Sequence, residues 1–362
     1  MKIAFLTRSL DPEFGGLDRY SFEVVSRVAG TPGYKVTALV EKKTSLDYDV
    51  QVLDRRVSIF ALVKNIFSSA KYLRSQDIVH ALDLFPYGLI AALATIGSGQ
   101  RLFICGVGTE SVVKLSHPLL GPVLKWVYHR AEKVICISKY TKKRILEKAP
   151  DLKNLEVVYL GIDYQKFSTL PEVSRKPHQI IGVGALKRRK GYHVSIEAVA
   201  KLVPKYHDLK YFIIGSQAIV KFYKQLKDQV RKLGIEKNVV FLQDVPDRDL
   251  IKLYAESSVF VLTSVNIGQH FEGYGLVFLE AAAAGLPSVG TKNCGIEEAV
   301  MDNQTGLLVA QNDASATTHA IGKLLSDRNL AKEFSLNARG YASQMTWDHT
   351  VSGYMKYYKH VE

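Results

Sequence analysis

The 362-residue sequence contains no long hydrophobic run and few cysteines, and each absence excludes a class of protein. The longest apolar stretch, residues 87–97, is about half as long as a membrane-spanning helix, so we expect a buried helix there. Cys105, Cys136 and Cys294 lie far apart and lack the spacing of a metal or redox site. Because Arg8 interrupts the first apolar segment before a signal-peptide core can form, we expect a cytoplasmic protein with reduced thiols.

Acidic residues are scarce relative to basic ones. The 48 Lys and Arg against 35 Asp and Glu leave a net charge of +13, which is spread over both halves of the chain. Such a field favours anionic partners, namely nucleotide sugars, acidic lipid headgroups or nucleic acid. The sequence carries no nucleic-acid-binding motif, so we expect no nucleic acid partner. A length of 362 residues is sufficient for two domains of ordinary size.

The order of apolar segments predicts an α/β fold made of two similar halves. In the first half we expect strands at residues 3–6, 35–40, 77–81, 102–105 and 133–137, with helices at 17–28 and 57–74. In the second half we expect strands at 179–183, 211–214, 239–242 and 259–262, with helices at 192–202 and 220–233. Residues 163–179 form the expected linker, and residues 329–360 are expected to be helical. This alternation is typical of doubly wound parallel sheets.

The most informative segment is residues 271–287, where Glu272 and Glu280 stand eight positions apart. Gly273-Tyr274-Gly275 predicts a tight loop, and the apolar residues that follow predict a helix. Free backbone N–H groups at a helix start form an anion site, and glycines let a ligand come close. A carboxylate at Glu280 can accept from the two hydroxyls of a ribose, and Glu272 can reach a second polyol. A phosphate between two hydroxylated groups describes a nucleotide sugar.

The same segment resembles the signature of retaining glycosyltransferases of family 4, through the two spaced glutamates followed by Ala-x-x-x-Gly-x-Pro. The resemblance implies the GT-B fold, with two Rossmann-like domains facing each other across a cleft. The acceptor-side domain would comprise residues 1–165 plus the C-terminal helix at about 346–362, which returns to it. Residues 166–345 would bind the nucleotide sugar. The implied reaction is metal-independent hexosyl transfer from a UDP- or GDP-sugar to a hydroxyl acceptor, with lipid-linked acceptors included, in cell-envelope glycolipid or polysaccharide synthesis.

Two glycine-containing loops support this interpretation. Residues 182–191 contain four consecutive cations at a strand-to-helix loop, which would repel one another unless an anion lies among them. The resemblance implies that Lys190 binds the diphosphate. Ala185 stands where relatives often have arginine, so Lys187, Arg188 or Arg189 would supply that charge. The Gly15-Gly16 loop opens the first helix and would border the cleft between donor and acceptor.

The resemblance thus implies catalytic roles for three residues. Glu272 would face the donor sugar and diphosphate, and Lys190 and Arg189 would stabilise the leaving group without a metal. The implied donor-binding residues are Gly15, Gly16, Gly184, Lys187, Arg188, Gly215, Val245, Gly273, Tyr274, Gly275, Leu276 and Glu280. Asp47-Tyr48-Asp49 has the form of the metal motif of another glycosyltransferase fold but lacks its context, so we expect no metal site.

The sequence departs from the family at Val107, where many relatives have a histidine that touches the donor sugar. Valine cannot donate this hydrogen bond, which is worth about 1 kcal/mol. His80 and Asp83, at the end of the strand at 77–81, are candidates to supply the missing contact. The expected residues on the sugar or acceptor side are His80, Asp83, Val107 and Gly108. The alternative for His80 is a structural role in the core.

The helix at residues 58–74 carries two different faces. One apolar face is expected to pack on the sheet and comprises Ile59, Leu62, Val63, Ile66, Ala70 and Leu73. A second stripe suits contact with an anionic membrane, because rings enter the headgroup layer and cations meet acidic lipid. It comprises Phe60, Lys64, Phe67, Lys71 and Arg74. The alternative is a solvated face whose phenylalanines are covered by a loop.

Two other functions stay open at this point. Val107 and Ala185 favour a non-catalytic GT-B subunit that binds a nucleotide sugar. Another GT-B activity, such as a sugar-nucleotide epimerase or a phosphorylase, is the second alternative. If the membrane stripe is real, the protein is peripheral on the inner face of the plasma membrane.

Overall fold

The computed structural model describes residues 1–12, 15–42, 46, 48–55, 58–169 and 173–359. The chain forms two compact units. Unit 1 comprises Met1–Leu160 and Trp347–Glu362, and unit 2 comprises Gly161–Thr346. The C-terminal segment therefore belongs to the same unit as the N-terminus.

Unit 1 contains, within its described residues, a seven-stranded parallel sheet with the order β3-β2-β1-β4-β5-β6-β7. The strands are β1 (Lys2–Leu6), β2 (Lys35–Val40), β3 (Asp49–Val52), β4 (Ile78–Ala81), β5 (Arg101–Gly106), β6 (Lys133–Cys136) and β7 (Leu155–Val157). The order reverses between β1 and β4, and in such sheets ligands bind outside the carboxyl ends of the strands at this switch point.

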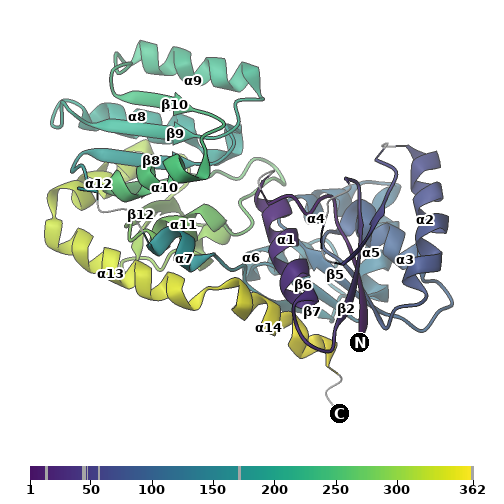
Figure 1. Cartoon of the computed structure of the whole chain (residues 1–362). Coiled ribbons are helices and arrows are strands. Elements are labelled where there is room, and N and C mark those ends of the chain that lie inside the picture. Colours follow the sequence, from purple (N-terminus) through teal and green to yellow (C-terminus); the bar gives the residue numbers. More distant parts are fainter. Residues whose placement is uncertain (13–14, 43–45, 47, 56–57, 170–172, 360–362) are drawn as a thin grey trace. The chain divides into compact units, whose positions relative to one another are not determined.

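Helices cover both faces of this sheet (Figure 1). The helices α2 (Ile59–Leu73), α3 (Leu89–Ala94) and α5 (Leu120–Arg130) form one layer, in which α3 packs against both α2 and α5. The helix α14 (Trp347–Tyr358) packs against α1 (Gly16–Ala29). Shorter helices are α4 (Glu110–Val113) and α6 (Lys139–Leu146). Helical turns at Leu84–Gly88 and Lys114–Ser116 precede α3 and α5.

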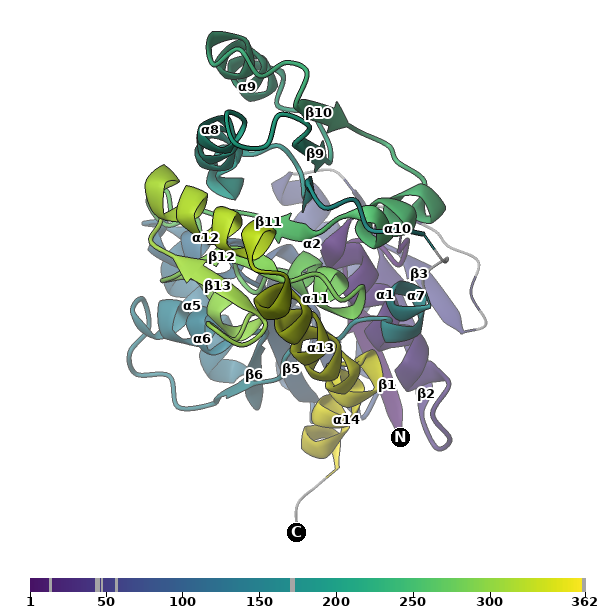
Figure 2. The ribbon, with the colours of Figure 1, turned by 90° about the vertical axis from the view of Figure 1, so that its left-hand side faces the viewer.

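Unit 2 contains, among the residues described, a six-stranded parallel sheet with the order β10-β9-β8-β11-β12-β13. The strands are β8 (Gln179–Val183), β9 (Lys210–Ile214), β10 (Val239–Leu242), β11 (Val259–Val261), β12 (Ser288–Thr291) and β13 (Gly306–Val309). Its helices are α7 (Tyr164–Ser168), α8 (Tyr192–Leu202), α9 (Val220–Lys232), α10 (Asp247–Glu256), α11 (Leu276–Ala283), α12 (Ala314–Ser326) and α13 (Arg328–Gln344). Figure 2 shows α12 and α13 in front of this sheet.

The predicted α/β class with two doubly wound parallel sheets is confirmed. Two details of the prediction are wrong. The expected linker contains α7, whose Phe167 is buried against Tyr254 and therefore belongs to the core of unit 2. The expected C-terminal helical stretch breaks at Met345 and Thr346 into α13 and α14, because the Met345 carbonyl accepts from Ile162 N–H instead.

The rotation of α2 also differs from the expectation. Ile59 and Val63, which the pattern assigned to the sheet-facing side, are 66% and 43% exposed. The buried residues are Ala61, Asn65, Ser69 and Leu73. The Asn65 amide exchanges two hydrogen bonds with the backbone of Asp54, at 2.7 and 3.0 Å, and so turns its own face of the helix inward. Ile59, Phe60, Val63 and Phe67 consequently face outward.

Candidate functional site

The carboxyl edge of the unit 2 sheet brings together the predicted cationic loop and the predicted glutamate segment. Gly184 follows β8 directly, and the cationic residues 187–190 lead into α8. Gly215 follows β9, and its backbone touches that of Gly184: a Cβ added at Gly215 would lie 2.2 Å from the Gly184 carbonyl oxygen. The loop-then-helix prediction for residues 273–283 is confirmed, since α11 begins at Leu276.

Glu272 is the centre of a buried ion cluster. Its Oε2 lies 2.7 Å from Lys190 Nζ and 2.9 Å from an Arg189 guanidinium nitrogen, and Ser264 donates to the same oxygen at 3.3 Å. Glu272 and Lys190 are 8% and 9% exposed. Burial raises the pKa of Glu272, but Lys190 and Arg189 outweigh it and lower that pKa to about 2. Burial lowers the pKa of Lys190, and the Glu272 carboxylate opposes this change.

The cationic loop is held by the segment that follows β11. Gly191 adopts a left-handed conformation at φ 71°, and a Cβ there would lie 1.7 Å from the carbonyl oxygen of Thr263. The Thr263 hydroxyl donates to the Gly191 carbonyl at 2.8 Å, and Val265 N–H donates to the Arg189 carbonyl at 2.7 Å. Only glycine permits this approach, so the loop geometry that aims Lys190 at Glu272 depends on Gly191.

A second glycine, Gly295, supports the glutamate loop and was not among the predicted site residues. A Cβ at Gly295 would lie 2.0 Å from the Gly273 carbonyl oxygen, and Gly295 N–H donates to the Glu272 carbonyl at 2.9 Å. The short helical turn Gly295–Glu298 thus presses directly on the loop before α11. Gly295 stands 23 positions from Glu272, and this separation by itself does not predict the contact.

Glu280 lies inside α11 and is 4% exposed. The Tyr254 hydroxyl, on α10, donates to Glu280 Oε2 at 3.0 Å. This hydrogen bond fixes the carboxylate from a different element, and sequence reasoning missed it. The side chain of Tyr254 also packs against Phe260 of β11, which ties α10 to the sheet.

The other predicted donor residues divide by exposure. Lys187 and Arg188 are exposed, and Val245 is half-buried just before α10. The Tyr274 side chain is only 1% exposed and interacts with Tyr341, so the expected ligand contact at this position stays a prediction for the backbone. Gly273, Gly275 and Leu276 present backbone at the start of α11.

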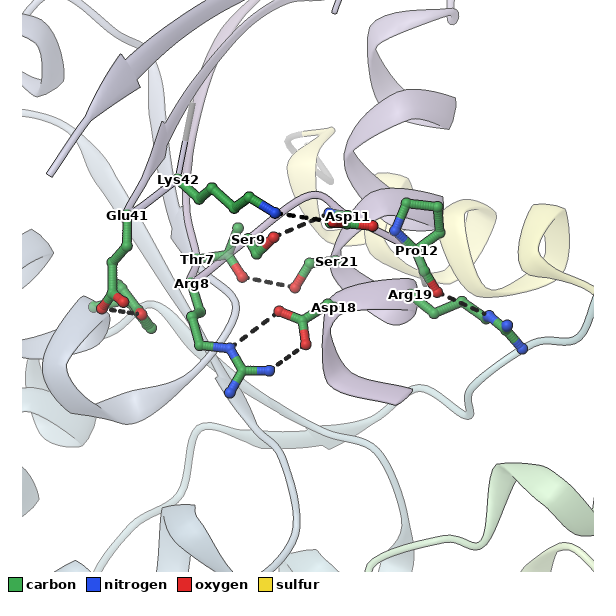
Figure 3. Close-up of polar contacts among 11 residues, drawn as sticks. Thr7, Arg8, Ser9, Asp11, Pro12, Asp18, Arg19, Ser21, Glu41 and Lys42 are labelled. Carbon is green, nitrogen blue, oxygen red and sulfur yellow. Dashed lines mark hydrogen bonds and ion pairs between the residues drawn. The ribbon is translucent and has the colours of Figure 1, made fainter. Parts of the chain in front are cut away.

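In unit 1, polar contacts fix the loop after β1 to the start of α1 (Figure 3). Arg8 donates to both carboxylate oxygens of Asp18, which is 1% exposed. The Thr7 and Ser21 hydroxyls share a hydrogen bond of 2.7 Å. Gly15 caps α1 and Gly16 is its first residue. The Arg8 side chain, which is ion-paired with Asp18, is 46% exposed at the carboxyl edge of this sheet.

His80 is a core residue, which agrees with the structural alternative and not with a place on the sugar or acceptor side. Its ring is completely buried, shares a hydrogen bond with the Tyr358 hydroxyl and lies 3.1 Å from the Cys105 sulfur. Its edge-to-face contacts with Tyr354 and Tyr358 place it under α14. Burial lowers the pKa of His80 to about 3, so the ring stays neutral.

Asp83 joins the loops that follow β4 and β5. Its Oδ1 accepts from Leu84 N–H at 2.7 Å and from the Ser111 hydroxyl at 3.2 Å, and Ser111 accepts from Val107 N–H at 2.8 Å. Burial raises the pKa of Asp83 to about 6. Val107 is half-buried, and Gly108 is buried at φ 60°. The Asp83 side chain is therefore engaged in holding its own loop.

Metal-binding geometry is absent from the part of the chain that the structure describes, where no group of three or more His, Cys, Asp or Glu could hold an ion. Asp49 begins the edge strand β3, and Asp47 lies outside the described residues.

Comparisons with known proteins match both units. Residues 14–166 match the family described as Glycosyltransferase Family 4, and residues 166–341 match Glycosyl transferases group 1. The GDP-mannose-dependent alpha-(1-6)-phosphatidylinositol monomannoside mannosyltransferase of Mycolicibacterium smegmatis is 26% identical over 361 residues, covering 93% of this chain and 92% of the relative. The D-inositol 3-phosphate glycosyltransferase of Corynebacterium urealyticum is 32% identical over 220 residues, covering 57% of this chain and 51% of the relative.

Among solved structures, Anabaena HepE in complex with UDP and glucose superposes with a TM-score of 0.81 at 19% identity, covering 99% of both chains. This likeness concerns the fold. The two adjoining family matches span nearly all of the chain, and they agree with the residues that carry the sequence resemblance. The chain belongs to glycosyltransferase family 4 and has the GT-B fold.

Proposed function

We propose that this glycosyltransferase moves a hexose from a UDP- or GDP-sugar to a hydroxyl acceptor with retention of anomeric configuration and without a metal. The observation that carries the proposal is the buried cluster of Glu272, Lys190 and Arg189 beside the start of α11. Two cations and a helix N-terminus converge on one point, which is the electrostatic requirement for a diphosphate leaving group.

Donor binding exchanges one anion for another in this proposal. The diphosphate takes the two cations that Glu272 now neutralises, and the released carboxylate accepts hydrogen bonds from hydroxyls of the donor sugar. The backbone N–H groups of residues 273–276 face the same phosphates. Glu280, held by Tyr254, accepts from the ribose diol. Gly184 and Gly215 allow the loops at the ends of β8 and β9 to pack closely at the edge where the nucleotide is proposed to bind.

Sugar transfer follows a front-face route. The bond between the anomeric carbon and the diphosphate oxygen breaks, and the acceptor oxygen forms its bond to the same face of the sugar. The acceptor proton passes to the departing phosphate oxygen, so no protein base is needed. Lys190 and Arg189 stabilise the negative charge that develops on the diphosphate, an effect worth several kcal/mol in a buried site.

The acceptor side is assigned to unit 1 and its C-terminal helix. The Gly15–Gly16 loop, Arg8 and the loops after β4 and β5 lie at the carboxyl edge of this sheet. The names of two relatives specify phosphatidylinositol monomannoside and D-inositol 3-phosphate, both of which carry a phosphate. We therefore propose that the acceptor is lipid-linked and that its anionic phosphate contacts the exposed part of the Arg8 side chain. Such an acceptor belongs to cell-envelope glycolipid or polysaccharide synthesis.

A screen of nucleoside diphosphates tests the donor assignment. The screen compares UDP, GDP, ADP and their sugars. Some of these compounds should raise the thermal midpoint of the protein and others should not, because only a compound bound by the folded state stabilises it. Product analysis with the stabilising sugar, with and without a chelator, then tests transfer, anomeric configuration and metal independence. Binding without turnover on any acceptor would favour a non-catalytic subunit, and an epimerised donor would favour an epimerase.

A further inference from the structure

The outer surface of unit 1 carries two apolar stripes on neighbouring helices. The α2 stripe consists of Ile59, Phe60, Val63 and Phe67, among which Phe60 is 84% and Phe67 76% exposed. The α5 stripe consists of Leu119, Val123 and Trp126, among which Leu119 is 82% exposed. Since α3 packs between α2 and α5 in one layer, the two helices that carry the stripes cover the same face of the sheet (Figure 1). Clustered exposed apolar side chains mark interaction sites, whereas single ones do not.

The two stripes lie near the functional edge of unit 1. In a doubly wound parallel sheet each helix runs antiparallel to its strands, so helix N-termini stand at the carboxyl edge. The α2 stripe occupies the first nine residues of α2, and the α5 stripe begins just before α5. The same edge carries Arg8 and the Gly15–Gly16 loop.

The charges on these helices have one sign. Neither the α2 sequence nor the α5 sequence contains an acidic residue. Lys64 has a 65% exposed side chain next to Asp54, Lys71 is also exposed, and Lys125 accompanies Trp126 on α5. Arg74 is different from the expectation: it donates to the carbonyls of Ala94 and Ile96 and ties α2 to α3.

We propose that the α2 stripe and the α5 stripe together dock unit 1 on an anionic lipid bilayer, at the inner face of the plasma membrane. Phenylalanine, leucine and tryptophan side chains enter the headgroup layer, and the lysines meet acidic headgroups. The proposed contact is interfacial. Within the described residues, no helix is long and apolar enough to cross a membrane. A symmetric dimer through the same face would bring together two copies of α2 and α5, which carry cations and no acidic residue of their own.

Two tryptophans make the contact directly measurable. The chain contains only Trp126 and Trp347, and Trp347 is 1% exposed while Trp126 is 39% exposed. Vesicles of phosphatidylcholine with phosphatidylglycerol should shift the emission of the full-length protein to shorter wavelength, and Trp126→Phe should abolish this shift. Phosphatidylcholine vesicles alone should produce a much smaller shift, because the lysines lose their anionic partners.

Co-sedimentation with the same vesicles tests the individual residues. Phe60→Ser/Phe67→Ser and Lys64→Glu/Lys71→Glu should each weaken partitioning by roughly tenfold or more. The matched control is Lys221→Glu/Lys224→Glu on α9 of unit 2, which makes the same change in net charge at exposed positions and should retain binding. Because all four α2 side chains are exposed, the variants should fold, and circular dichroism checks this.

Either of two results would overturn the proposal. The first is a wild-type protein that does not bind anionic vesicles, or face variants and the α9 control that bind equally. The second is a concentration-dependent dimer in lipid-free solution that the Phe60→Ser/Phe67→Ser variant dissociates, measured by analytical ultracentrifugation. In that case the stripes form an interface between copies of the chain.

Discussion

The Glu272 carboxylate lies 2.7 Å from the Lys190 ammonium, with both side chains almost completely buried at the carboxyl edge of the unit 2 sheet. The cation proposed to hold the donor diphosphate thus already has an anionic partner within the protein. A donor must compete with this carboxylate for Lys190. Glu272 should therefore oppose nucleotide binding while it assists sugar transfer.

The first prediction concerns Glu272→Gln. Removing the negative charge leaves Lys190 and Arg189 without a partner, so UDP or GDP should bind about tenfold more tightly, from a charged interaction of about 1.5 kcal/mol. Transfer should fall by at least roughly a hundredfold, because the amide is a weaker acceptor for the sugar hydroxyls. Calorimetric titration and a transfer assay measure the two effects.

The Glu272→Gln variant should also unfold more easily without nucleotide, since an unpaired buried charge costs about 3 kcal/mol, and nucleotide should restore its thermal midpoint. Asp228→Asn on the exposed surface of α9 is the control and should change neither property. Weaker nucleotide binding by Glu272→Gln would contradict the proposed competition.

A second prediction concerns the hydroxyl of Tyr254. Tyr254→Phe removes the donor to Glu280 and keeps the ring that packs against Phe260, so the carboxylate loses its orientation and the fold persists. UDP or GDP affinity should fall by about threefold to tenfold, as expected for one hydrogen bond of about 1 kcal/mol. Pyrophosphate affinity should not change, because pyrophosphate has no ribose. Equal losses for nucleotide and pyrophosphate would show that Tyr254 supports the loop as a whole.

The third prediction rests on the contact between Gly295 and Gly273. Gly295→Ala places a methyl group within 2.0 Å of the Gly273 carbonyl oxygen and should displace the loop before α11. We expect destabilisation of about 1–3 kcal/mol in urea unfolding, together with a large loss of nucleotide binding. Gly340→Ala in α13 is the control: it meets open space and should leave stability unchanged or raise it by about 0.5–1 kcal/mol. Normal nucleotide binding by Gly295→Ala would exclude the supporting role.

The fourth prediction is a pH dependence at Asp83. Burial raises the pKa of this carboxyl from 3.8 to about 6, so the folded state retains a proton that the unfolded state has released. The contribution of Asp83 to the free energy of unfolding is fully present below about pH 4 and is lost as the pH rises to about 6. Asp83→Asn keeps an acceptor for Leu84 and Ser111 and removes the ionisation.

The measurement is the difference in unfolding free energy between Asp83→Asn and the wild type across this pH range. The difference should grow in favour of the variant and level off above about pH 6, at up to about 3 kcal/mol. Subtracting the two unfolding free energies removes the contribution of other titrating groups. One of them is His80, which is buried in its neutral form and therefore makes the stability rise with pH. A difference that stays constant with pH would contradict the raised pKa.

Much of the fold could be predicted because its signals are local. Apolar runs separated by amphipathic segments give the strands and helices, and the spacing of Glu272 and Glu280 around Gly273-Tyr274-Gly275 predicts the loop and the helix that follow. The edge strand β3 and the strands β7, β12 and β13 were missed, since strands of three or four residues are too short to show a clear period. The faces of α2 were assigned from periodicity alone, and the anchoring of Asn65 to Asp54 turned the helix differently.

The sequence by itself determined the two-sheet α/β architecture, the family and the segments that supply glycines, cations and carboxylates. Those properties follow from residue type and short spacing. The tertiary structure alone decided which side chains meet: Arg189 pairs with Glu272 across 83 positions, Tyr254 reaches Glu280, and His80 is enclosed beneath α14. Such contacts depend on how distant elements pack, and packing is a property of the whole fold that no local pattern encodes.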